Sequence, residues 1–190
     1  ECTSFTSVTI PDSVTSIGAE AFRKCTNLAS VTIPDSVTSI GADAFSKCEN
    51  LMSINVGINN TAYSTVDGVL LNKNKTILVR YPQGKTATSY TIPDSVTSIG
   101  ECAFWGCTNL KSINLPQWVK KIGNSAFDGC KSLTSISIPP SVKKIWDLNK
   151  FELVDSERKV TYRAQLEQAC NMFPANTVYL VGIGGTIDRY

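Results

Sequence analysis

The chain has 190 residues, of which 42% are hydrophobic, and this suits one packed domain or one short array of repeats. Its 18 basic and 16 acidic residues give a net charge of +2, a poor match to the strongly basic balance of nucleic-acid-binding proteins. It contains no histidine, which excludes histidine-ligated metals and nucleophile–histidine pairs. No apolar run reaches the roughly 20 residues that cross a bilayer. We therefore expect no nucleic-acid partner, no cofactor and no direct membrane insertion by this chain.

A 23-residue repeat runs along the chain. The sequences IPDSVTSIGAEAFRKC at 10–25 and IPDSVTSIGADAFSKC at 33–48 are nearly identical, and the same register returns at Ile92, Leu115 and Ile138. Each unit fits the pattern IPxSVxxIGxxAFxxCxxLxxI, and the last unit is cut short after Ile145. Recurrence at a fixed period is the signature of a solenoid, which is therefore predicted over residues 1–145.

Two extended stretches and a turn account for the pattern within one unit. Apolar and polar residues alternate over 31–33, as in a strand with one buried face, and Pro34 ends this strand because it has no N–H for a ladder. A second extended stretch covers 37–40, and Gly41 permits a turn. Ala44 and Phe45 then begin a helical turn that places the phenyl ring in the core.

A single unit has too few apolar side chains to offset the conformational entropy lost in ordering 23 residues. Stacking removes this deficit, because each strand then pairs with its neighbours and the core continues from unit to unit. The repeat therefore predicts a parallel sheet on one side of the solenoid, with short helical turns and strands on the other.

One unit is longer than the others. The step from Val56 to Ile92 is 36 residues, so the unit at 57–91 carries 13 extra residues. Within it, apolar stretches at 69–71 and 77–81 flank a polar turn at 72–75, which predicts a hairpin. We expect a bulging but continuous coil here, not a domain boundary.

The motif IPDSVTSIGxxAFxxC, together with DGVLLNKNKTILVRYP at 67–82, resembles the BspA-like leucine-rich repeats of bacterial and protist surface proteins. The likeness covers about residues 2–145. It implies a leucine-rich-repeat solenoid, extracellular display at a cell surface, and recognition of a protein or glycan of a host or neighbouring cell. It offers no catalytic residues.

The pattern fails at Trp146, which stands in a slot that glycine holds in the earlier units. Residues 146–190 are therefore predicted to form a small non-repeat α/β segment, with an amphipathic helix over 157–173 and a strand over 177–181. Two interpretations stay open: the segment is a cap over the end of the solenoid, or it begins a separate domain. The glycines of the slot are Gly18, Gly41, Gly100 and Gly123.

The cysteines favour packing over chemistry. Five of them share one repeat position, where stacked, parallel side chains have poor geometry for a disulfide. Without Cys-x-x-Cys pairs or histidines a zinc site is not expected, so we predict buried free thiols. Cys102 has polar counterparts in the other units and is expected to be exposed, as a reactive thiol or as a chance substitution. The five are Cys2, Cys25, Cys48, Cys107 and Cys130.

Two tryptophans replace polar residues of the repeat. Trp105 stands in a slot held elsewhere by Arg23, Ser46 and Asp128. Trp118 stands in a slot that serine holds in four other units. Both are expected to face solvent, either as binding anchors or as cover for a neighbouring coil.

Polar residues mark two further surfaces. The outward strand positions offer hydrogen bonds to a glycan or protein, or form only the ordinary face of a soluble sheet. Four lysines that replace Thr/Ser pairs form a basic patch for an acidic partner, or a solvated edge. The strand residues are Ser30, Thr32, Ser53, Asn55, Ser112, Asn114, Ser135 and Ser137, and the lysines are Lys120, Lys121, Lys143 and Lys144.

These features predict a non-catalytic recognition or adhesion module. The alternative is an intracellular scaffold or secreted effector whose repeats bind other proteins. An enzyme with its catalytic part in 146–190 is disfavoured, because that segment is short and has no base–nucleophile pair. The candidate binding residues are Trp118, Trp105, Asn55, Asn114, Ser53, Ser112, Ser135, Lys120, Lys121, Lys143 and Lys144.

Overall fold

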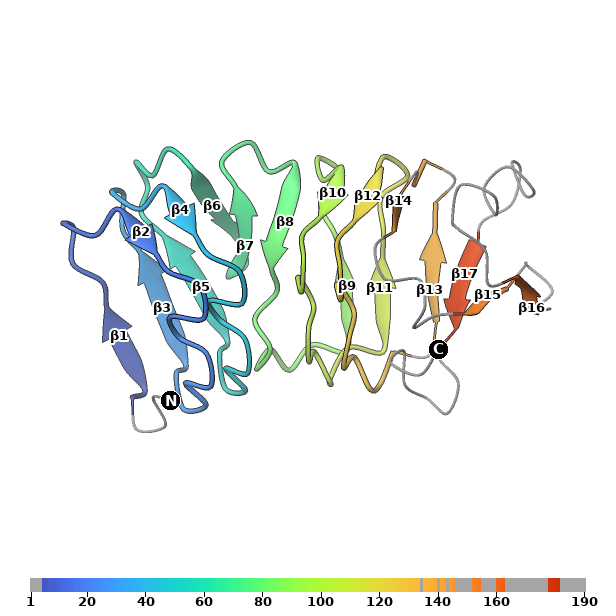
Figure 1. The fold of residues 1–190 in the computed structure, drawn as a ribbon, viewed down its shortest axis with the longest axis horizontal. Helices are drawn as coiled ribbons and strands as arrows, with labels where there is room; N and C mark the ends of the chain where they lie inside the picture. The colour runs from blue at the N-terminus through green and yellow to red at the C-terminus, as the bar shows by residue number, and fades with distance from the viewer. Residues whose placement is uncertain are drawn as a thin grey trace. The chain divides into compact units, whose positions relative to one another are not determined.

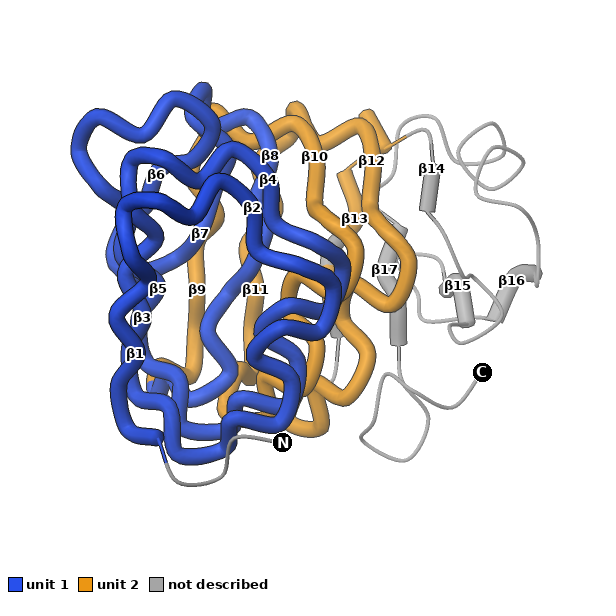
Figure 2. Tube along the Cα trace, turned by 60° about the vertical axis from the view of Figure 1, so that its left-hand side comes forward, with its two compact units in different colours: residues 1–86 blue, residues 87–190 orange. Residues whose placement is uncertain are grey.

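The computed structural model describes residues 5–133, 135–139, 141–142, 144–145, 152–154, 160–162 and 178–181. The chain divides into two compact units, residues 1–86 and 87–190 (Figure 2). Each is a β-solenoid whose coils repeat every 23 residues, as the sequence predicts. The division falls within the irregular unit 57–91, where the sequence analysis expects an unbroken coil. The limit of the repeat region at residue 145 stays a prediction.

Unit 1 contains two parallel sheets, one on each side of the coils (Figure 1). In the first, Ser7 lies beside Ser30 and Ser30 beside Ser53, so each strand is displaced by one repeat. The second sheet follows the same rule, with Ser16 beside Ser39. The first sheet consists of β1 (Ser7–Thr9), β3 (Ser30–Ile33) and β5 (Ser53–Val56), and the second of β2 (Ser16–Ile17) and β4 (Ser39–Ile40).

The long unit forms an antiparallel meander of β6 (Tyr63–Val66), β7 (Val69–Asn72) and β8 (Ile77–Arg80). The predicted hairpin around 72–75 is confirmed. The strand β6 is not predicted from the sequence, although Asp67 and Gly68, both with positive φ, form the two-residue turn that joins it to β7.

Asn60 anchors this meander to the preceding coil, and its side chain is fully buried. Its amide donates to the carbonyls of Pro34 and Val37 at 2.7 and 2.9 Å. Its side-chain oxygen accepts from the backbone N–H groups of Ala62 and Tyr63 at 2.9 and 2.7 Å. The meander is thus bonded to the coil before it, and both belong to unit 1.

Unit 2 repeats the two parallel sheets. In one, Ser112 lies beside Ser89, and in the other Lys121 lies between Ser98 and Lys144. The first sheet pairs β9 (Ser89–Thr91) with β11 (Ser112–Asn114), and the second joins β10 (Ser98–Ile99), β12 (Lys121–Ile122) and β14 (Lys144–Ile145).

A four-stranded antiparallel sheet completes unit 2. It has the order β13 (Ser135–Ile138), β17 (Val178–Val181), β15 (Glu152–Val154) and β16 (Val160–Tyr162). The strand predicted at 177–181 is confirmed as β17. The helix predicted over 157–173 is wrong at 160–162, where Val, Thr and Tyr favour a strand. The other residues of that helix lie outside the described part of the chain, as does Trp146.

The phenylalanines of the repeat form a row within each unit. The rings of Phe22 and Phe45 stack with centroids 5.4 Å apart, and those of Phe104 and Phe127 stack at 5.3 Å. Successive coils therefore share one interior, as the repeat predicts.

The buried cysteines also join one coil to the next. The thiol of Cys48 lies 2.9 Å from the carbonyl oxygen of Phe22 in the preceding coil, and Cys130 lies 3.1 Å from that of Phe104. Cys25, Cys48, Cys107 and Cys130 are buried and free, which confirms the expectation for these four. Cys2 lies outside the described residues.

The turn that carries Phe45 is not helical. Asp43 and Lys47 adopt φ values of 55° and 60°, and these left-handed residues produce successive tight turns instead of a helical turn. The backbone of this segment also pairs with its neighbour, since the Phe22 N–H donates to the Ala44 carbonyl at 2.8 Å. Adjacent coils therefore meet through backbone hydrogen bonds on three sides.

Gly41 begins the turn predicted for it, since the Ala44 N–H donates to its carbonyl at 3.4 Å, and it also permits a close approach between coils. Its φ is not positive, but a Cβ at this position would lie closer than 3.0 Å to the backbone of Ala19 in the preceding coil. Gly123 meets Gly100 and Glu101 in the same way. The glycine slot therefore sets how closely the coils stack.

Candidate functional site

Trp118 is the most exposed aromatic side chain among the described residues, at 61%. It lies in the corner turn between β11 and β12 (Figure 1), which the hydrogen bond from the Val119 N–H to the Pro116 carbonyl closes at 3.2 Å. Val119 is buried, whereas Lys120 and Lys121 are exposed. This segment therefore directs one apolar side chain inward and presents an indole and two ammonium groups to solvent.

The serine that normally occupies the Trp118 slot has a structural role. The Ser36 hydroxyl donates to the Val14 carbonyl of the preceding coil at 2.7 Å, and the Ser141 hydroxyl donates to Val119 at the same distance. By the same register, a serine at position 118 would donate to the Val96 carbonyl. Trp118 cannot make this bond, which is worth about 1 kcal/mol. Since its ring is also mostly exposed, packing does not explain the replacement.

Of the four candidate lysines, the structure describes the side chains of two. Lys120 and Lys121 are exposed. Lys144 is the register partner of Lys121, so the strands β12 and β14 carry lysines at adjacent positions. Only the backbone of Lys144 belongs to the described structure, and Lys143 lies outside it. We define Trp118, Lys120 and Lys121 as the Trp118 surface.

The strand residues form a polar face in each unit. In unit 1 Asn55 is exposed, but Ser53 is half-buried because Gly68 lies over it, where a Cβ would come 2.8 Å from that of Ser53. In unit 2 Ser112 and Asn114 are exposed, and the Asn114 amide donates to the Thr91 hydroxyl at 3.2 Å. The side chain of Ser135 lies outside the described part. Ser53 is thus the least accessible of these candidates.

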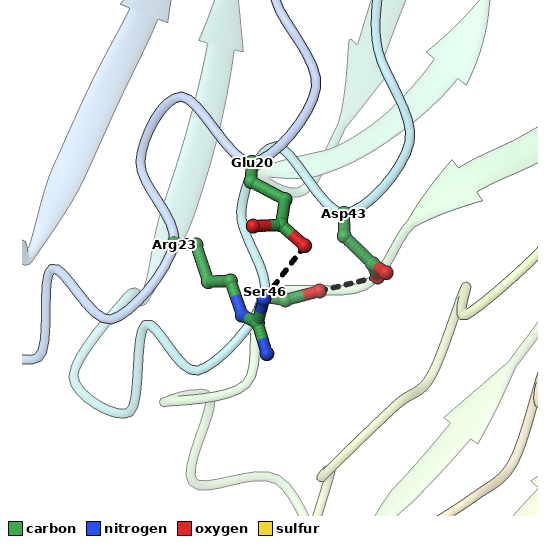
Figure 3. Close-up of polar contacts among 4 residues, drawn as sticks. All are labelled: Glu20, Arg23, Asp43 and Ser46. Carbon is green, nitrogen blue, oxygen red and sulfur yellow. Dashed lines mark hydrogen bonds and ion pairs between the residues drawn. The ribbon is translucent and has the colours of Figure 1, made fainter. Parts of the chain in front are cut away.

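Trp105 is half-buried, so it faces solvent only in part. The reason is the slot itself, since its counterpart Ser46 is only 5% exposed. Polar residues occupy this slot because they close a turn: Arg23 pairs with Glu20 at 2.6 Å, and Ser46 bonds Asp43 (Figure 3). Polarity at this position therefore indicates local bonding and not exposure.

Cys102 stands in the Glu20 and Asp43 slot of the same turn. It is a free, half-buried cysteine with a φ of 52°, so its expected exposure is only partial.

The exposed residues of the described structure are polar, charged or aromatic at the candidate positions. In that part of the chain no three Cys, Asp or Glu side chains gather as a metal site would require. No helix of the described structure is long and apolar enough to span a membrane. The exposed groups can donate or accept hydrogen bonds, pair with an opposite charge and stack on a flat ring.

Stacked 23-residue coils, parallel sheets and a shared row of phenylalanines define a leucine-rich-repeat solenoid. The chain belongs to the BspA-type family, because the family model of the BspA type leucine rich repeat region matches it in six copies over residues 1–73 and 80–180. The second match runs past residue 145, where the sequence analysis places the end of the repeats.

Three solved bacterial proteins are similar. A leucine-rich repeat protein from Eubacterium ventriosum is 40% identical with a TM-score of 0.69. The pneumococcal vaccine antigen PcpA is 28% identical with a TM-score of 0.66. A leucine rich cell surface protein from Faecalibacterium prausnitzii is 34% identical with a TM-score of 0.57.

These likenesses cover 73%, 73% and 72% of this chain but only 37%, 40% and 42% of the respective relatives, so the chain spans about two fifths of their length. A search of curated proteins gave no match. Proteins of this family are typically non-catalytic repeat proteins that mediate protein interaction, and they are often associated with the cell surface.

Proposed function

We propose that this chain is a non-catalytic recognition module, displayed at a cell surface, that binds a protein or glycan of a host or neighbouring cell. One observation carries the proposal: Trp118 replaces a serine that bonds neighbouring coils elsewhere, yet its side chain is 61% exposed. Exposed tryptophan is a typical anchor of binding interfaces. Membership of the BspA-type family and the similarity to a cell surface protein of Faecalibacterium prausnitzii support the location.

An array of glycans and extracellular-matrix proteins tests the binding function, with the purified chain as the probe. We expect at least one ligand whose binding weakens about tenfold or more in W118S, since anchor residues contribute upwards of about 1.4 kcal/mol. The variants N55A and N114A test the strand faces of units 1 and 2. The control is T15A, which changes an exposed residue outside the candidate set. An array without any reproducible ligand contradicts the proposal.

A second function, an intracellular scaffold or secreted effector, is favoured by one observation. Cys25, Cys48, Cys107 and Cys130 are free and buried, which a reducing compartment tolerates easily. Antibody labelling of intact and permeabilised cells separates the two. Labelling of intact cells that disappears after brief protease treatment supports surface display, whereas labelling only after permeabilisation supports the scaffold.

A further inference from the structure

The charge of the repeat changes abruptly between two successive units. Residues 92–114 contain two acidic residues and one lysine, whereas 115–137 contain one acidic residue and three lysines. Most of the changes lie in the corner turn and the short strand that follows it, and the five changed residues of the second unit are exposed. The pairs of residues at equivalent repeat positions are Asp94 and Gln117, Ser95 and Trp118, Thr97 and Lys120, Ser98 and Lys121, and Glu101 and Asn124.

The fold does not require these lysines. Thr97 and Ser98 hold the same positions in the preceding coil, and unit 1 has Ser16 beside Ser39 at the equivalent register. Lys121 and Lys144 are instead register partners on strands that lie about 4.8 Å apart. Like charges at directly opposite positions are destabilising, and an anion that bound both groups would offset their repulsion. These two register positions are therefore suited to an anionic ligand.

Trp118 places a second requirement on the ligand, which must offer a flat face to the indole ring. The backbone between Trp118 and Lys120 spans at most about 7 Å, so the indole and the ammonium groups can contact one ligand. A flat indole face packs against the C–H face of a pyranose ring, and lysines form charge-assisted hydrogen bonds to carboxylates or sulfates. A sugar ring that carries an anion meets both requirements.

We propose that the Trp118 surface binds an anionic polysaccharide, with a sugar ring on Trp118 and carboxylate or sulfate groups on Lys120 and Lys121. This inference rests on the proposed function and names its ligand class. Anions that recur along a polymer match lysines that recur from coil to coil. A nucleic acid fits less well, because single-strand binding uses several stacking aromatics and Trp118 is the one strongly exposed ring of unit 2 in the described structure.

The test measures the affinity of the full chain for heparin, polygalacturonate, dextran and a single-stranded oligonucleotide by biolayer interferometry. W118S and K120T/K121S restore the residues that the preceding coil carries, so both should fold. K73S/K111S is the matched control, because it removes two exposed lysines from other places. We expect binding to heparin, to polygalacturonate or to both, none to dextran, and a loss of about tenfold or more in W118S and in K120T/K121S but not in the control.

Heparin alone would identify sulfate as the recognised anion, and polygalacturonate alone would identify carboxylate; either supports the inference. An equal loss in K73S/K111S, or unchanged affinity in W118S, would overturn it, because only net charge would then matter. Binding of the oligonucleotide with the same dependence on Trp118 would also overturn it. An array ligand that all three variants still bind would refute this inference while the proposed recognition function stands.

Discussion

Replacing Gly41 with alanine tests how the coils stack. The new Cβ would lie closer than 3.0 Å to the backbone of Ala19, which must move away together with its coil. That movement stretches the bonds from the Gly41 N–H to the Ile17 carbonyl (2.8 Å) and from the Thr38 N–H to the Thr15 carbonyl (2.9 Å). Each bond is worth about 1 kcal/mol, and overpacking costs a further 1–3 kcal/mol or so. We expect G41A to lower the free energy of unfolding by about 3 kcal/mol or more.

Gly18 provides the matched control, because it stands in the same slot and no atom lies within 4 Å of a Cβ built there. G18A should leave stability unchanged or raise it by up to about 1 kcal/mol, through the smaller entropy of the unfolded chain. Thermal unfolding followed by circular dichroism measures both, and a loss of about 3 kcal/mol corresponds to roughly 6–12 °C in Tm. If G41A unfolds at the same temperature as G18A, glycine does not set the spacing of the coils.

Three further predictions concern other contacts. N60A should lower the free energy of unfolding by about 3 kcal/mol or more, since it removes four hydrogen bonds of a fully buried side chain. Urea denaturation measures this change, with N59A at an exposed position as the control. Equal stability of the two variants would contradict the anchoring role of Asn60. In a C2S/C170S background, Ellman's reagent should modify the half-buried Cys102 in the native protein and the other four thiols only after unfolding; rapid reaction of more than one thiol would show that the cysteine row is accessible. W118S should raise the free energy of unfolding by about 1 kcal/mol, because the new hydroxyl can donate to a carbonyl of the preceding coil, as Ser36 and Ser141 do. A lower melting temperature of W118S would mean that the Trp118 ring contributes to packing.

The repeat predicts the solenoid because the same slots recur. Val31, Ile33 and Phe45 point inward in the sequence pattern and are buried in the structure. Geometry between coils is harder to predict from one unit. The role of Gly41 depends on Ala19, a neighbour 22 residues away in the sequence. Asp43 has a left-handed φ because it lies in a tight turn, and the sequence pattern of this turn resembles that of a helical turn.

The candidate site shows the same contrast between what the repeat pattern predicts and what the contacts between coils determine. Trp118 is exposed because the hydroxyl in its slot reaches over the corner to the preceding coil, so a larger side chain there extends into solvent. Trp105 is half-buried, like Arg23 and Asp128 in the same slot, a property that the polar character of these two residues conceals. Ile58 is an apolar residue that is 91% exposed, and no signal in the repeat predicts this exposure.

The backbone bonds that join the coils on three sides have a consequence for how such proteins diversify. Those bonds involve amide and carbonyl groups that every residue except proline supplies, so the outward side chains are free to change without loss of registration. A duplicated coil therefore inherits its place in the stack but not its ligand. One coil can therefore change its outward residues while its neighbours keep theirs, as the replacement of the slot serine by Trp118 illustrates.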